Sequence, residues 1–118
     1  MDEKRKARLQ AGGIDVDSAL ARMMGSEALL ERFLGKFPDD LNYPALCGAI
    51  AAQDAEGALR AAHTLKGVCG NLSMTELFNQ LAAQVAEFRG GDWDAAAARM
   101  PAIAAAYDRA VAAIRGEA

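Results

Sequence analysis

Apolar residues recur at helical spacing through every long segment of this chain, and no stretch alternates with the two-residue period of a β-strand. Glycines at positions 12–13, 25 and 90–91 separate these segments, as does the Asn-Leu-Ser sequence at 71–73. The pattern predicts an all-α fold, an antiparallel four-helix bundle with a short additional N-terminal helix. A chain of 118 residues is long enough for one such domain and too short for two.

The short helix is predicted over about residues 16–24, with Asp15 as its cap. The first long helix starts at the capping residue Ser26 and continues to about residue 52, with a kink or a break caused by Pro38 and Pro44. Its buried stripe is expected to comprise Leu29, Leu30, Phe33, Leu34, Phe37 and Leu41.

Three further long helices are predicted over about residues 55–70, 73–89 and 93–114. The second of them opens with Ser73-Met74-Thr75-Glu76, which matches the capping box, a reciprocal pair of side-chain bonds to backbone N–H groups. The last one follows Asp92, and Pro101 is expected to bend it near its first two turns.

The first twelve residues carry a short basic cluster beside two acidic residues: Lys4, Arg5, Lys6 and Arg8 next to Asp2 and Glu3. We interpret residues 1–12 as a basic tail or a helix start, and residues 13–118 as the helical bundle. The net charge of −3 argues against nucleic acid as the main partner, because that partner requires clustered basic charge.

No apolar run approaches the roughly 18 residues of a membrane span, and no apolar segment of a signal peptide follows the charged N-terminus. Cys47 and Cys69 are too few for a disulfide framework and lack the spacing of a metal site, so we expect them to act as small apolar side chains. These features favour a reducing, cytoplasmic location. We expect a monomer, because the pattern leaves no large unpaired apolar face.

The segment from Ala61 to Leu72 contains the only histidine of the chain. On a helix of 3.6 residues per turn, one side of this segment is apolar and comprises Ala58, Ala62, Leu65, Cys69 and Leu72. Another side presents, at spacings of i, i+3, i+4 and i+7, the residues His63, Lys66, Gly67 and Gly70. The histidine therefore shares a helix face with a cation and two residues that have no side chain.

A glycine inside a helix costs up to about 1 kcal/mol relative to alanine. Gly67 and Gly70 therefore indicate a surface that another protein approaches closely, with tight helix packing as the alternative. A neutral imidazole is a nucleophile. If His63 carried a phosphoryl group, Lys66 could offset its charge through a hydrogen bond worth roughly 1.5–3 kcal/mol.

The sequence His63-Thr64-Leu65-Lys66-Gly67, preceded by Arg60-Ala61-Ala62 and followed by Gly70-Asn71-Leu72, resembles the motif of histidine-containing phosphotransfer (HPt) domains. The resemblance extends over about residues 13–115. It implies that His63 is the exposed phosphoacceptor, that Lys66 stabilises the phosphoryl group, and that Gly67 leaves room for a partner to dock.

The resemblance also implies the partners. The phosphoryl group would come from an aspartate of one response-regulator receiver domain and pass to another, in a relay that includes a hybrid sensor histidine kinase. The chain would be a carrier without kinase activity and without a cofactor of its own, because Mg²⁺ and the acidic pocket belong to the receiver.

The chain departs from the family at two positions. Many members have glycine where Ser73 stands, and the capping box offers a local reason for the serine. Many members also carry, on the fourth helix, a glutamine that hydrogen-bonds the phosphoaccepting histidine. Val85 occupies that position, with Gln84 beside it and Gln80 one turn earlier. Gln84 is our candidate for orienting His63, and the choice among these residues stays open.

Two other functions remain open from the sequence. A non-phosphorylated docking adaptor would bind a receiver or another signalling domain through the same small-residue face, with His63 dispensable. A structural helical module would have no signalling role. An enzyme is disfavoured, because the chain has no Glu-x-x-His pair, no glycine-rich phosphate loop and no nucleophile elbow.

Overall fold

The computed structural model describes residues 1–116, which form helices and no named strand. The α-helices are α1 (Glu3–Ala11), α2 (Val16–Arg22), α3 (Glu27–Lys36), α4 (Asn42–Ala51), α5 (Ala55–Asn71), α6 (Thr75–Arg89), α7 (Trp93–Ala98) and α8 (Met100–Arg115). A 3-10 turn, η1 (Phe37–Asp39), joins α3 to α4. The predicted all-α fold is confirmed.

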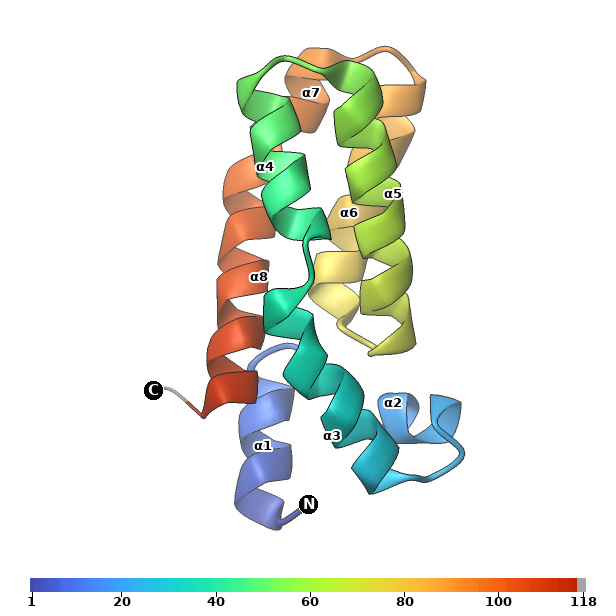
Figure 1. Ribbon diagram of the computed structural model, residues 1–118, viewed down its shortest axis with the longest axis vertical. Helices are drawn as coiled ribbons and strands as arrows, with labels where there is room; N and C mark the ends of the chain where they lie inside the picture. The colour runs from blue at the N-terminus through green and yellow to red at the C-terminus, as the bar shows by residue number, and fades with distance from the viewer. Residues whose placement is uncertain (117–118) are drawn as a thin grey trace.

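The bundle is formed by α4, α5, α6 and α8, which run side by side along the long axis, while α1, α2 and α3 lie at its lower end (Figure 1). The core of the protein is built largely of leucine and alanine, and its fully buried large side chains come from α3 as well as from the four bundle helices: Leu30, Leu34, Leu46, Leu65, Leu81 and Ile103. On the side between α4 and α8, the rings of Tyr43 and Tyr107 stack with centroids 3.8 Å apart. The predicted four-helix bundle is therefore confirmed.

The first long helix predicted from the sequence is divided into α3 and α4. Pro38 lies in η1, and the Asp40 carboxylate accepts hydrogen bonds from the backbone N–H and the side-chain amide of Asn42 at the start of α4. The break changes the helical register, so Leu41 is 78% exposed and does not continue the buried stripe. Phe33 is also 41% exposed. For these two residues the predicted burial was wrong.

Several helix starts agree with the sequence. Ser26 Oγ accepts a hydrogen bond from the Leu29 N–H, and the carboxylates of Asp15, Asp54 and Asp92 cap α2, α5 and α7 in the same way. The last long helix is interrupted at Arg99, shortly before Pro101, and therefore forms α7 and α8.

The predicted capping box at Ser73 is not formed. The helix α6 begins at Thr75 after Met74, which makes no side-chain cap, and Ser73 has a positive φ of 51°. This left-handed residue reverses the chain between α5 and α6, and its hydroxyl donates to Ser18 Oγ on α2 at 2.9 Å. The serine side chain therefore ties the turn to α2. A positive φ is also the backbone conformation that glycine adopts most easily.

The basic N-terminal segment is a helix rather than a tail. Asp2 caps α1 by accepting a hydrogen bond from the Arg5 N–H at 2.7 Å, and Leu9 is fully buried against the rest of the protein. Of the two interpretations of residues 1–12, the structure therefore supports the helix.

Candidate functional site

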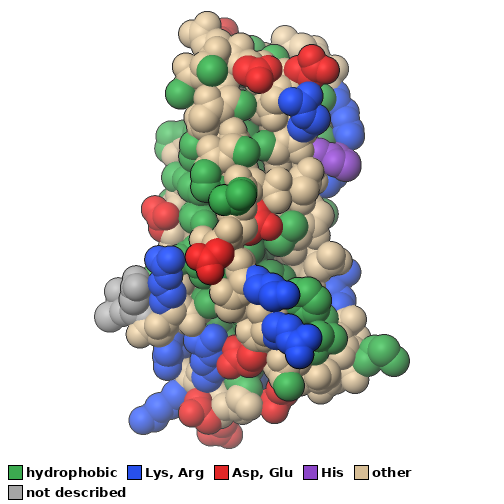
Figure 2. Space-filling view, viewed as in Figure 1, with side chains coloured by type: hydrophobic (Ala, Val, Ile, Leu, Met, Phe, Trp, Pro, Cys, Tyr) green, Lys and Arg blue, Asp and Glu red, His purple; other side chains and the backbone are tan. Residues whose placement is uncertain are grey.

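The helix α5 places His63 on the surface of the bundle. Small and apolar residues at helical spacing hold the opposite face of α5 in the core: Ala58, Ala61, Ala62, Leu65 and Cys69. Burial of Cys69 is deep enough to raise the pKa of its thiol to about 12. His63 lies outside this stripe and is exposed, and the imidazole stands at the edge of the molecule with basic side chains near it (Figure 2).

The two glycines of this face have different surroundings. A Cβ atom added to Gly67 would meet no atom within 4 Å outside its own helix, so no internal packing explains a glycine one turn beyond His63. A Cβ atom added to Gly70 would lie 3.3 Å from the ring of Phe78 on α6. Gly67 therefore leaves an open surface, whereas Gly70 allows α5 and α6 to pack closely.

Lys66 lies one turn beyond His63 and is half-buried. Side chains on a helix lean toward its N-terminus, so the Lys66 stem leans toward the turn that carries His63. Within residues 1–116, no carboxylate forms an ion pair with the Lys66 ammonium group. Arg60, one turn before His63, pairs instead with Glu56 at 3.8 Å. Lys66 is therefore the cation that is available to a group on His63.

Within residues 1–116, Gln84 makes no hydrogen bond to His63. Its side chain is fully buried, and its Nε2 group donates to the Ala96 carbonyl at 3.0 Å and to Met100 Sδ at 3.2 Å. Its Oε1 atom is buried without a hydrogen-bond partner. The predicted role of Gln84 in orienting His63 is therefore not found, because its amide is engaged between α6, α7 and α8 in the core.

The reason lies in the break between α7 and α8. At this break, Arg99 Nε donates to Glu87 Oε1 at 2.6 Å, and Arg99 Nη1 donates to Gln80 Oε1 at 3.2 Å. The three polar residues of α6 at spacings of i, i+4 and i+7, namely Gln80, Gln84 and Glu87, therefore all bind the α7–α8 break. Over residues 1–116, no hydrogen bond reaches the His63 imidazole from either glutamine.

A hollow of about 470 Å³ adjoins this face and was not predicted. Its walls come from α2, α3, η1 and α5, and are mainly apolar: Met23, Phe33, Phe37, Val68 and Leu72. Arg22, Lys36, Asp40 and Asn71 also line it. Figure 2 shows basic and apolar side chains together on the lower right of the face in view. Asn71 lies one turn beyond Gly67 on the same side of α5, so the hollow begins one turn further along the helix than the open surface at Gly67.

No group of three or more His, Cys, Asp or Glu side chains in residues 1–116 is arranged to hold a metal ion. None of the helices in that part of the chain is both long enough and apolar enough to cross a membrane.

Comparison with known proteins assigns the family. A family model described as the Hpt domain matches residues 28–113, a span that contains His63, Lys66 and Gly67. Searches of curated proteins and of solved structures found no match. Hpt domains are phosphotransfer intermediates of phosphorelays with receiver-domain partners, and they are not kinases. The chain belongs to this family of histidine phosphotransfer domains.

Proposed function

We propose that this chain is the phosphocarrier of a multistep phosphorelay and that His63 is the residue that carries the phosphoryl group. The phosphoryl group comes from an aspartyl phosphate on one receiver domain and passes to the aspartate of another. The observation that carries the proposal is the single histidine of the chain, exposed on α5 one turn before a glycine with open space above it.

The transfer is a displacement at phosphorus. The lone pair of a neutral imidazole nitrogen attacks the phosphorus of the aspartyl phosphate, and a nitrogen–phosphorus bond forms as the phosphorus–oxygen bond to the carboxyl group breaks. The donor aspartate leaves as a carboxylate. On the second receiver the reverse displacement restores the free imidazole. We assign the Mg²⁺ of this reaction to the acidic pocket of the receiver and no cofactor to this chain.

Lys66 supplies the charge for the phosphorylated state. A phosphoryl group brings negative charge and strong acceptor oxygens to the position of His63. The Lys66 stem leans toward that turn, and its ammonium group has no carboxylate partner within residues 1–116. A charge-assisted hydrogen bond from Lys66 then stabilises the phosphorylated form by roughly 1.5–3 kcal/mol.

Gly67 and the hollow receive the partner. The receiver must bring its aspartate to within bonding distance of the imidazole, so its backbone has to pass close to α5. Gly67 offers no side chain to obstruct that approach. The hollow, one turn further along α5, offers apolar contact from Phe33 and Val68, and Arg22 and Lys36 add positive charge to its walls.

The relay requires a source of phosphoryl groups, because an Hpt domain is not a kinase. We propose a hybrid sensor histidine kinase as that source and a monomer as the acting form of the carrier.

The test is chemical labelling with a small phosphoryl donor. The wild-type protein, incubated with phosphoramidate, should gain one phosphoryl group that is labile in acid and stable in base. His63→Gln should gain none, and the matched control Thr64→Ala, one residue away on the same exposed surface, should label as the wild type does. If no protein is labelled while His63→Gln and the wild type bind receiver domains equally, the chain is a docking adaptor rather than a carrier.

A further inference from the structure

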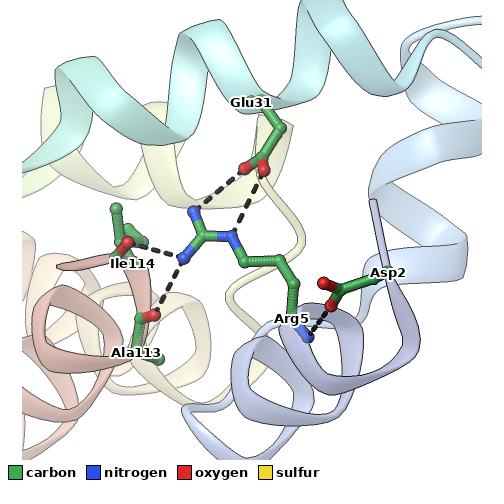
Figure 3. A network of polar contacts seen from close by, with 5 residues as sticks. All are labelled: Asp2, Arg5, Glu31, Ala113 and Ile114. Carbon is green, nitrogen blue, oxygen red and sulfur yellow. Dashed lines mark hydrogen bonds and ion pairs between the residues drawn. The ribbon is translucent and has the colours of Figure 1, made fainter. Parts of the chain in front are cut away.

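The helix α1 lies outside the span that matches the family, which begins at residue 28, yet it is joined to the bundle by a specific polar network. The centre of this network is Arg5, whose side chain lies between α3 and the end of α8 (Figure 3). Arg5 is half-buried, with 21% of its side-chain surface exposed, so solvent screens these bonds less than it would on an open surface.

Arg5 binds two elements at once. Its Nε and Nη2 groups donate to the two carboxylate oxygens of Glu31 on α3, at 3.2 and 3.0 Å. Its Nη1 group donates to the carbonyls of Ala113 and Ile114 at 3.2 and 2.7 Å. These carbonyls belong to the last turn of α8, where a cation is favourable. The Ala113 carbonyl also accepts a hydrogen bond from the Gly116 N–H at 3.2 Å. One guanidinium group therefore joins the end of α8 to α3.

The same helix is attached to α2. Lys6 Nζ lies 2.8 Å from a carboxylate oxygen of Asp17, and Leu9 is fully buried. The helix α1 is thus linked to both α2 and α3, the two elements that with η1 and α5 line the hollow. Figure 1 shows these three helices grouped at one end of the bundle.

The geometry of α3 connects Arg5 to the hollow. Residues two apart on a helix are separated by about 200° around its axis. Glu31 therefore faces α1, whereas Phe33 lies on the other side of α3 and lines the hollow. The helices α2 and α3 have only 7 and 10 residues. Helices of this length depend on tertiary contacts for their stability. The contacts that α2 and α3 make with α1 and with the bundle therefore determine their positions.

We propose that Arg5 is a positioning residue for receiver docking: by joining α3 to the end of α8, it holds the hollow in the shape that a receiver domain binds. This inference rests on the proposed function. Arg5 acts through α3 and has no part in the chemistry at His63.

The test compares Arg5→Met with Arg109→Met, which removes an ion pair of similar length between α8 and Glu76 on α6. Transfer rates are measured against the concentration of a purified receiver domain charged with acetyl phosphate. Arg5→Met should raise KM by about 5- to 10-fold, the lower range of coupling between sites, and leave kcat within about twofold. Arg109→Met should leave both unchanged. Arg5→Lys should restore KM only partly, because an ammonium group cannot reproduce the four bonds.

Two further measurements test the role of Arg5. Amide hydrogen exchange, which needs no partner, should become faster in residues 16–36 of Arg5→Met and remain unchanged in α5 and α6. Glu31→Gln, which keeps the bonds from Arg5 to α8, should show the same exchange pattern at smaller amplitude. Unchanged exchange, or faster exchange with a wild-type KM, overturns the role of Arg5. Failure of phosphoramidate to label His63 in the wild type would instead overturn the proposed function. The hydrogen-exchange result does not depend on that labelling and would still report whether Arg5 holds α2 and α3 in place.

Discussion

Replacement of Gly67 by glutamine tests whether this glycine leaves room for a docking partner or for packing inside the protein. Glutamine is a much better helix former than glycine, and a Cβ atom at this position meets nothing within 4 Å outside its own helix. The substitution should therefore raise the free energy of unfolding by about 0.5 kcal/mol. With an unfolding entropy of about 2.1 cal/mol/K per residue, this gain corresponds to a rise in Tm of about 2 °C.

The same substitution should obstruct the receiver. The new side chain stands one turn beyond His63 on the surface that the receiver must approach, and a loss of about 1.4 kcal/mol of docking energy alone lowers the transfer rate tenfold at low receiver concentration. We therefore expect at least about a tenfold loss of receiver-dependent transfer. Labelling by phosphoramidate, which needs no docking surface, should fall much less.

Gly35→Gln is the control, because Gly35 is an exposed glycine in the last turn of α3 with no atom within 4 Å of an added Cβ. Both variants should show a similar gain in Tm, measured by circular dichroism, and only Gly67→Gln should lose transfer from a phosphorylated receiver. A Gly67→Gln protein that melts well below the wild type would show that Gly67 packs inside. One that transfers at the wild-type rate would show that the receiver docks elsewhere.

Three further outcomes are expected. Lys66→Gln should slow transfer to His63 by about 10- to 100-fold, because one charge-assisted hydrogen bond is lost. An unchanged rate in a quenched time course of transfer would show that Lys66 does not stabilise the phosphoryl group. Gln84→Ala should lower the free energy of unfolding in urea by about 2 kcal/mol, because it leaves a cavity in the core and the Ala96 carbonyl keeps only its bond from the Arg99 N–H. The folded variant should still label on His63, and loss of labelling would restore Gln84 as the orienting residue. Burial raises the pKa of Cys69 from its usual 9.0 to about 12, so the folded state holds the thiol proton more tightly than the unfolded state, and this stability is complete below about pH 9 and is lost as the pH rises toward 12. Cys69→Ala should therefore show a smaller loss of stability between these pH values than the wild type, and equal losses would contradict the assignment.

The parts of the fold that local chemistry determines were predictable from the sequence. Small and apolar residues at spacings of i, i+3, i+4 and i+7 define the buried face of α5, so the exposure of His63 follows from helical periodicity alone. Ser26 and Asp92 cap their helices as their residue types predict. These predictions succeed because each depends on a helix and its immediate neighbours.

The predictions that failed depend on contacts between elements distant in sequence. Ser73 follows a capping pattern, but the reversal between α5 and α6 gives it a positive φ and directs its hydroxyl to Ser18. Gln84 is one residue from the expected position on α6, yet the break before Pro101 provides a carbonyl that its amide binds. Leu41 continues an apolar stripe that Pro38 interrupts.

The hollow was missed for the same reason. Phe33 fits the apolar stripe of α3, and only the positions of α2 and α5 show that its ring lines a surface depression. One sequence feature could have indicated the hollow. Phe33 and Leu34 are adjacent apolar residues, and adjacent residues point to different sides of a helix, so both cannot belong to the same buried stripe.

Transfer between two receiver domains tests the central claim most directly. A receiver domain carrying ³²P on its aspartate is mixed with this protein and then with a second, unphosphorylated receiver, and the label is followed by gel electrophoresis. Our account predicts that label leaves the first receiver, appears on this protein in an acid-labile form, and then reaches the second receiver, with no transfer in His63→Gln. Label that reaches the second receiver at the same rate through His63→Gln would contradict a carrier role for His63.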